Sequence, residues 1–120
     1  MAPSMQVTLD SRPASKVEAE ALVSYVFEPE KEQGSAVQGV VAELDRAAGG
    51  ALGKLAASGE LTGKTLEFTL VHFAPGIGAQ RIVLIGAGKR EKFGTAELRR
   101  LASAAVRYLK ARSVKRIAFR

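Results

Sequence analysis

The sequence contains no cysteine, only one histidine, His72, and no long apolar run. Without cysteine the chain can form neither a disulfide framework nor a thiolate metal site, and it offers no cysteine nucleophile. No stretch approaches the roughly 20 apolar residues of a membrane-spanning helix, and residues 1–5 lack the basic region and apolar run of a secretory signal. We therefore expect a cytoplasmic protein with no membrane contact.

The length of the chain, 120 residues, suits a single domain, because one core usually closes within about 50 to 200 residues. With 47% hydrophobic and 25% charged residues, the composition is that of a globular protein with enough apolar material to offset the entropy of ordering the chain. We expect residues 1–120 to form one domain.

The net charge of +6 hides a strong difference between the two halves of the chain. Residues 1–60 hold 5 basic and 9 acidic side chains, which gives 5 − 9 = −4. Residues 61–120 hold 13 basic and 3 acidic side chains, which gives 13 − 3 = +10. The basicity therefore belongs to the second half, and any attraction for phosphate is expected there.

Apolar and β-branched residues predict strands, and the connections between them predict how two of the strands pair. The near-continuous apolarity of residues 21–28 indicates a central strand that is buried on both faces. Residues 74–80 are too few for a helical crossover, so the strands on either side should pair antiparallel in a mixed sheet. The predicted strands are residues 5–9, 21–28, 65–73, 81–86 and 114–119.

Residues 35–59 carry apolar side chains at the spacing of one helix face. Ser35 is a suitable N-cap for this helix, and Gly59 is a suitable stop. Three glycines within it indicate either close packing against a neighbour, which we favour, or a kink: Gly49, Gly50 and Gly53.

A second helix is predicted over residues 95–112, with Thr95 as its cap and Glu97 in its first turn. Its apolar stripe comprises Leu98, Leu101, Ala102, Ala105 and Leu109. Together with the strands, the two helices give the order β-β-α-β-β-α-β, which is typical of helices layered on a sheet.

The sequence offers no convincing catalytic, cofactor-binding or metal-ligating residue. His72 lies within a predicted strand, away from any Cys, Asp or Glu in a ligand pattern, and one histidine makes a serine triad implausible. Paired carboxylates such as Glu43 and Asp45 have a spacing that does not bring them together on a helix. Residues 86–91 (GAGKRE) resemble a dinucleotide loop, but Glu91 replaces its third glycine, so we favour a structural turn.

Basic residues of the second half form a candidate phosphate-binding surface, whose alternative role is to keep a helix soluble or to contact an acidic partner. Aromatic side chains for stacking on bases are scarce there, with Phe93 and Tyr108 nearby. The candidate nucleic-acid contacts are Lys89, Arg90, Arg99, Arg100, Arg107 and Lys110.

Three blocks of the sequence together resemble the N-terminal domain of the leucyl (cytosol) aminopeptidase family. They are residues 42–52 (AELDRAAGGAL), 59–64 (GELTGK) and 75–89 (PGIGAQRIVLIGAGK). The resemblance covers nearly all of the chain from Leu22 onward and implies an α/β fold, namely a macro-domain-like three-layer αβα sandwich with a mixed sheet.

The resemblance also implies that the catalytic machinery lies in a separate C-terminal domain. In the family that domain removes N-terminal residues from peptides with two divalent metal ions, commonly zinc or manganese, and carries an NTDAEGRL signature that this sequence lacks. No catalytic residue can therefore be assigned here. The family further implies a homohexamer, and some bacterial members bind DNA.

The family's domain continues with further elements, whereas this sequence ends at Arg120 directly after a predicted strand. We therefore expect a truncated domain with an unpaired sheet edge, and with it self-association or marginal stability. The leading hypothesis is a non-catalytic accessory and assembly domain of an aminopeptidase. The alternatives are a nucleic-acid-binding module and, least favoured, an ADP-ribose site inherited with the macro-like fold.

Overall fold

The computed structural model describes residues 12–30 and 34–120, so the strand predicted at residues 5–9 lies outside the described part. Short 3-10 turns precede the first strand and follow the third one, over Ala14–Lys16 and Arg90–Lys92. The strands and helices are β1 (Ala21–Phe27), α1 (Val40–Ala47), α2 (Ala51–Ala57), β2 (Phe68–His72), β3 (Arg81–Gly88), α3 (Thr95–Lys110) and β4 (Ile117–Phe119).

The strands form one mixed sheet in the order β2-β3-β1-β4. β1 runs parallel to both of its neighbours, and β2 pairs antiparallel with β3. The antiparallel pair predicted from the short connection over residues 74–80 is therefore confirmed. So is the central place of the first apolar strand, because β1 lies between β3 and β4.

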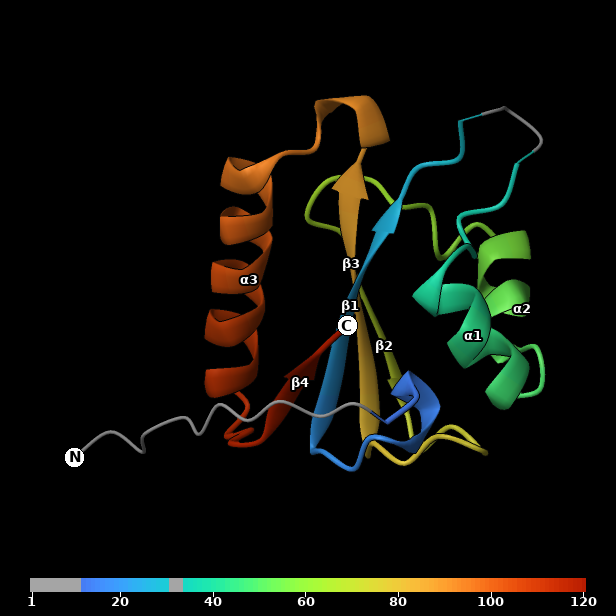
Figure 1. The fold of residues 1–120 in the computed structure, drawn as a ribbon, viewed down its shortest axis with the longest axis vertical. Coiled ribbons are helices and arrows are strands. Elements are labelled where there is room, and N and C mark those ends of the chain that lie inside the picture. The colour runs from blue at the N-terminus through green and yellow to red at the C-terminus, as the bar shows by residue number, and fades with distance from the viewer. Residues whose placement is uncertain (1–11, 31–33) are drawn as a thin grey trace.

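Helices cover both faces of this sheet, with α1 and α2 on one side and α3 on the other (Figure 1). Alternate residues of the strands consequently enter two separate cores. Leu22 and Ile82 are fully buried on the side of α1 and α2, whereas Val83 and Ile85 are buried on the side of α3. Burial of each such side chain contributes about 1.5–3 kcal/mol. The predicted three-layer αβα sandwich is confirmed.

The single helix predicted over residues 35–59 is wrong, because two helices, α1 and α2, occupy this stretch. The chain breaks between them at Gly49 and Gly50, whose φ angles are +69° and +88°. A Cβ at either glycine would meet nothing within 4 Å. Gly49 and Gly50 therefore permit a left-handed turn, and the close packing that we favoured for them is wrong. Gly59, with φ +85°, follows α2 as the predicted stop.

The start of α1 also differs from the prediction. Ser35 is not the helix cap, since its Oγ accepts a hydrogen bond from the Val37 N–H (3.1 Å) in a separate turn. Gly39 precedes the helix with φ +60° and ψ −129°, a conformation that interrupts any helix running on from Ser35. The helical residues therefore begin at Val40.

Helix α3 confirms the predicted second helix but changes its cap and one member of its apolar stripe. Thr95 is the first helical residue, and the preceding Gly94 takes the cap position, where its N–H donates to Glu97 Oε2 (3.0 Å). Leu101 and Leu109 are buried as expected, whereas Leu98 is 46% exposed. The predicted stripe lies on the correct side of the helix, but the described residues cover Leu98 only in part.

Two predicted strands are shorter in the structure than in the sequence analysis. The strand predicted at residues 65–73 is confined to β2, because Leu66 and Phe73 have positive φ angles of 60° and 49° that end the ladder on both sides. The strand predicted at residues 114–119 is confined to β4. Val114 instead closes the end of α3, where its N–H donates to the Leu109 carbonyl (3.0 Å).

Candidate nucleic-acid interface

The outer face of α3 gathers four of the six predicted basic residues. With 3.6 residues per turn, they fall within a sector of about 100° around the helix axis. All four are exposed, and the buried stripe of α3 lies on the other side of the helix. The four residues, called the α3 basic face below, are Arg99, Arg100, Arg107 and Lys110.

Lys89 and Arg90 follow β3 and lie in different surroundings. Lys89 and Arg100 line the same hollow beside the start of α3, so the structure brings these two predicted residues together. Arg90 instead faces β1, where its guanidinium lies 4.3 Å from the centre of the Phe27 ring and its Nε lies 3.7 Å from Glu30 Oε1. Arg90 is therefore separated from the α3 basic face and is partly neutralised.

The aromatic side chains near this surface are packed against one another. Phe93 stacks on Tyr25 with ring centres 5.2 Å apart. Tyr108 stacks on Phe68 at 4.4 Å, and the Arg112 guanidinium lies 3.7 Å above the Tyr108 ring. Because these rings pack against one another or against Arg112, we expect contact with nucleic acid at this surface to involve mainly phosphates.

The glycines of the GAG sequence after β3 serve close backbone packing. A side chain at Gly86 would overlap the carbonyl group of Lys64, and one at Gly88 would overlap Thr65. The N–H groups of both glycines are already bonded, Gly88 to the Gly63 carbonyl and Gly86 to the Glu67 carbonyl, each over 2.8 Å. These bonds support the predicted structural turn, because a phosphate-binding loop needs its N–H groups free.

The second glycine loop, over residues 74–80, is also held by the rest of the fold. Gly76 packs against the backbone of Ala47 at the end of α1. The Gly78 N–H donates to the Ser15 carbonyl (2.8 Å). This agrees with the predicted turn between antiparallel strands. His72 lies at the exposed end of β2.

Carboxylates of the described residues act as acceptors for isolated backbone N–H groups. Glu20 Oε2 accepts from the Lys115 N–H (2.7 Å), and this bond lowers the pKa of the Glu20 carboxyl from its usual 4.5. Glu43 Oε1 accepts from the Ala14 N–H (3.1 Å). Asp45 Oδ1 accepts from the Gly53 N–H (2.8 Å).

The described carboxylates and histidine do not gather around a metal position. No group of three or more His, Cys, Asp or Glu side chains that could hold a metal ion occurs within residues 12–30 and 34–120. The residues present therefore do not fit the two divalent ions that the family resemblance implies for the catalytic domain. In the same part of the chain, no helix is both long and apolar enough to cross a membrane.

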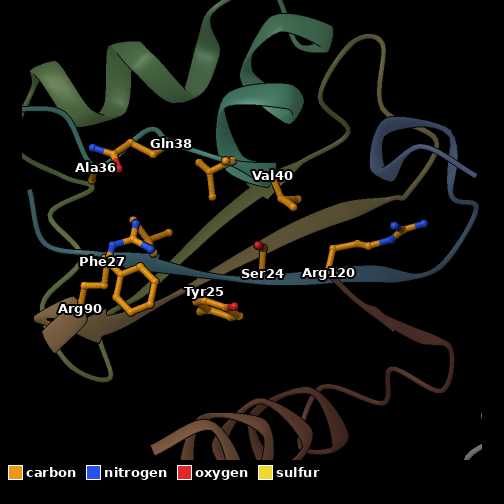
Figure 2. Close-up of a pocket in the computed structure, with 11 residues that line it drawn as sticks. Ser24, Tyr25, Phe27, Ala36, Gln38, Val40, Arg90 and Arg120 are labelled. Carbon is orange, nitrogen blue, oxygen red and sulfur yellow. The ribbon is translucent and has the colours of Figure 1, made fainter. Parts of the chain in front are cut away.

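A cavity of about 160 Å³ that the sequence analysis missed lies between β1 and the start of α1. Ser24 points into it from the α1 side of β1, while Tyr25 points to the opposite side of the strand (Figure 2). Ser24 is 3% exposed. The sequence analysis did not single it out, because it lies within an apolar strand. Its apolar neighbours along β1 give no signal of a cavity, because the lining also includes residues of other segments, such as Gln38 and Arg90.

The three layers and their sheet order place the chain among the macrodomain-like α/β proteins. It superposes on the macrodomain of Mycobacterium tuberculosis DarG with a TM-score of 0.66, over 97% of this chain and 76% of that chain, at 17% identity. At that identity the likeness shows the fold alone. The sequence pattern of the cytosol aminopeptidase family, N-terminal domain, matches residues 23–120. The chain therefore belongs to the cytosol aminopeptidase family.

Curated relatives in this family are much longer than the chain. The chain is 44% identical over 114 residues to a probable cytosol aminopeptidase of Solibacter usitatus. The aligned region covers 95% of this chain and 21% of the relative. A probable cytosol aminopeptidase of Koribacter versatilis is 49% identical over 61 residues, or 51% of this chain and 12% of that relative. The chain thus spans about a fifth of the length of the Solibacter relative.

Proposed function

We propose that this chain is a non-catalytic accessory and assembly domain of a cytosol aminopeptidase that removes N-terminal residues from peptides. The observation that carries the proposal is the family match over residues 23–120, which is confined to the N-terminal domain. The chemistry agrees with it, because Glu20, Glu43 and Asp45 are occupied as backbone acceptors and no metal-binding cluster occurs among the described residues. Peptide hydrolysis at a metal centre needs such a cluster to activate water.

The rest of the proposal concerns the whole enzyme. Two divalent metal ions, zinc or manganese, are held by its C-terminal catalytic domain and supply the water-activating chemistry there. Residues 1–120 form a single domain, whose partners are that catalytic domain and further copies of the enzyme in a cytoplasmic homohexamer. The support for these statements is the family membership and the length of the relatives.

A direct assay tests the accessory role. The purified 120-residue chain is incubated with leucine p-nitroanilide in the presence of zinc or manganese, beside the full-length Solibacter relative as the positive control. We expect release of nitroaniline by the relative alone. Metal-dependent release by the 120-residue chain would overturn the proposal.

A second candidate function is contact with nucleic acid, and the α3 basic face is the observation that favours it. Its four exposed charges share one side of a helix, with Lys89 adjoining them through the hollow it shares with Arg100. Arg90 contributes less because it is engaged with Glu30 and Phe27. Binding of this kind would be salt-dependent and largely independent of sequence.

Duplex DNA titrated at low and moderate salt tests this candidate. Each phosphate contact adds about 0.9 to the slope of log affinity against log salt, so the variant R99E/R107E should bind more weakly and with a shallower slope. A control variant, R46E/K54E, makes the same kind of charge change on α1 and α2, across the sheet. Equal losses in both variants, or binding that does not respond to salt, would reject a specific role for the α3 basic face.

A further inference from the structure

Strand β1 extends beyond the strand that covers its outer edge. β4 pairs with Ala21, Leu22 and Val23 only, although β1 continues to Phe27. On its other edge β1 remains paired with β3 as far as Phe27. The second half of β1 therefore has one edge without a partner strand among the described residues, although it lies at the centre of the sheet.

The hydrogen bonds show which backbone groups face this open edge. The Arg120 N–H donates to the Val23 carbonyl (2.8 Å), so Val23 directs its carbonyl toward β4. On the β3 side, the Glu28 N–H donates to the Gly88 carbonyl (2.9 Å). Because successive residues of a strand direct their backbone groups to opposite edges, Tyr25 and Phe27 direct theirs outward beyond the end of β4.

Apolar side chains gather beside this open edge on the α3 side of the sheet. A groove of about 150 Å³ there is lined by Tyr25, Leu98 and Phe119, together with the more buried Leu101 and Ala102. The first three are 39%, 46% and 48% exposed, and they make up three of the five large hydrophobic side chains exposed in the described part of the chain. A clustered exposed apolar surface of this kind indicates an interaction site.

We propose that the open edge of β1 is the docking site for an extended segment of the same aminopeptidase chain that follows position 120 and continues β4. The parallel ladder is regular up to Arg120, so a continuing strand needs no change of direction. The Solibacter relative, of which the chain spans 21%, has the length to supply such a segment. This inference rests on the proposed function, since it requires a longer enzyme.

The register of β4 fixes what each added residue would contact. Val23 is paired with Phe119, so position 121 would lie beside Tyr25 and direct its side chain into the apolar groove next to Leu98. Position 122 would point to the other side of the sheet, toward the cavity beside Ser24 (Figure 2). Its N–H would donate to the Tyr25 carbonyl, and its carbonyl would accept from the Phe27 N–H.

Hydrogen exchange on an extended chain tests this docking. The ten residues that follow the matched region in the Solibacter relative are fused after Arg120, and exchange is measured by NMR at a concentration at which each chain sediments as a monomer. We expect at least a tenfold slowing of exchange at the Phe27 amide, with little change at Val26, whose amide faces β3. Unchanged exchange at Phe27, or slow exchange already present without the extension, would overturn the proposal.

Proline substitutions in the added segment provide a matched pair. Proline at the second added position removes the N–H that should reach Tyr25 and is expected to abolish the protection of Phe27. Proline at the third added position removes an N–H that faces away from β1, and an edge strand tolerates it. Equal effects of the two prolines would reject the predicted register.

The outcome is independent of the peptidase assay. Failure of the extension to dock would leave the accessory role standing, because an aminopeptidase could connect its domains by another route. Metal-dependent hydrolysis by the 120-residue chain would remove the accessory role but leave the measured protection of Phe27 unaffected.

Discussion

Several carboxylates in this domain accept hydrogen bonds from backbone N–H groups that have no partner in a helix or strand. Glu43 reaches the N–H of Ala14, 29 residues away, and Glu20 reaches the N–H of Lys115, 95 residues away. Such charge-assisted bonds are stronger than those between neutral groups. They join the 3-10 turn at Ala14–Lys16 to α1, and the start of β1 to the segment before β4.

Glu20 gives the fold a pH dependence whose sign is fixed by its bond to Lys115. The bond lowers the pKa of the folded Glu20 carboxyl below its usual 4.5, so the stabilisation is present above the unfolded pKa and is lost as the pH falls through the folded pKa. We expect Glu20→Gln to lower the melting temperature at pH 7 and to lose much of that effect in acid, as measured by circular dichroism.

Glu60 offers a matched control for Glu20, because it is exposed and follows α2. Glu60→Gln should leave the melting temperature nearly unchanged at both pH values. A Glu20→Gln variant whose deficit grows as the pH falls would contradict the assigned role of the carboxylate.

For the glycines of the GAG sequence, the residue pattern predicted a structural turn but not the contacts that require glycine. Glu91, in place of a third glycine, already favoured a structural turn. The sequence could not indicate why Gly86 and Gly88 are glycines, because the groups that exclude a side chain there belong to Lys64 and Thr65, more than twenty residues earlier.

At the scale of elements, helical periodicity predicted the correct buried face for residues 40–57 but the wrong number of helices. α1 and α2 both bury leucines, Leu44 and Leu52, at positions that one continuous helix would also have given. Only the positive φ angles of Gly49 and Gly50 separate the two helices. A single sequence cannot distinguish a glycine that permits a turn from one that permits close packing.

The break between α1 and α2 requires a new cap, which Asp45 supplies to the Gly53 N–H over 2.8 Å. We expect Asp45→Ala to lower the free energy of unfolding by about 1 kcal/mol, the usual effect of losing a side-chain cap. Urea denaturation followed by circular dichroism measures it. Lys54→Ala, an exposed position on α2, is the control and should change stability by less than about 0.5 kcal/mol. A larger loss at Lys54 than at Asp45 would contradict the cap.

At the scale of the whole molecule, the sheet carries two cores, and one of them is incompletely covered near Leu98. We expect the 120-residue chain to self-associate as its concentration rises, because Tyr25, Leu98 and Phe119 form an exposed apolar groove. This groove lies beside a strand edge that β4 leaves uncovered in the described part of the chain. Sedimentation velocity over a range of concentrations measures the association.

Two substitutions distinguish association through this groove from non-specific association of exposed apolar side chains. Leu98→Gln should weaken self-association, whereas Phe73→Gln should not, although Phe73 is 75% exposed and thus the more accessible of the two. A monodisperse monomer at high protein concentration would contradict the expectation. So would an equal response to the two substitutions.

The sequence by itself determined the layered α/β architecture, the central apolar strand, the antiparallel pair and the family. Those properties follow from local periodicity, from the length of one connection and from contiguous motifs, all of which act over short stretches of chain. Only the tertiary structure decided the break at Gly49 and Gly50, the partners of Glu20 and Glu43, and the exposure of Leu98. Each of these depends on groups that are distant in sequence and adjacent in space, or on a backbone conformation that several local patterns allow.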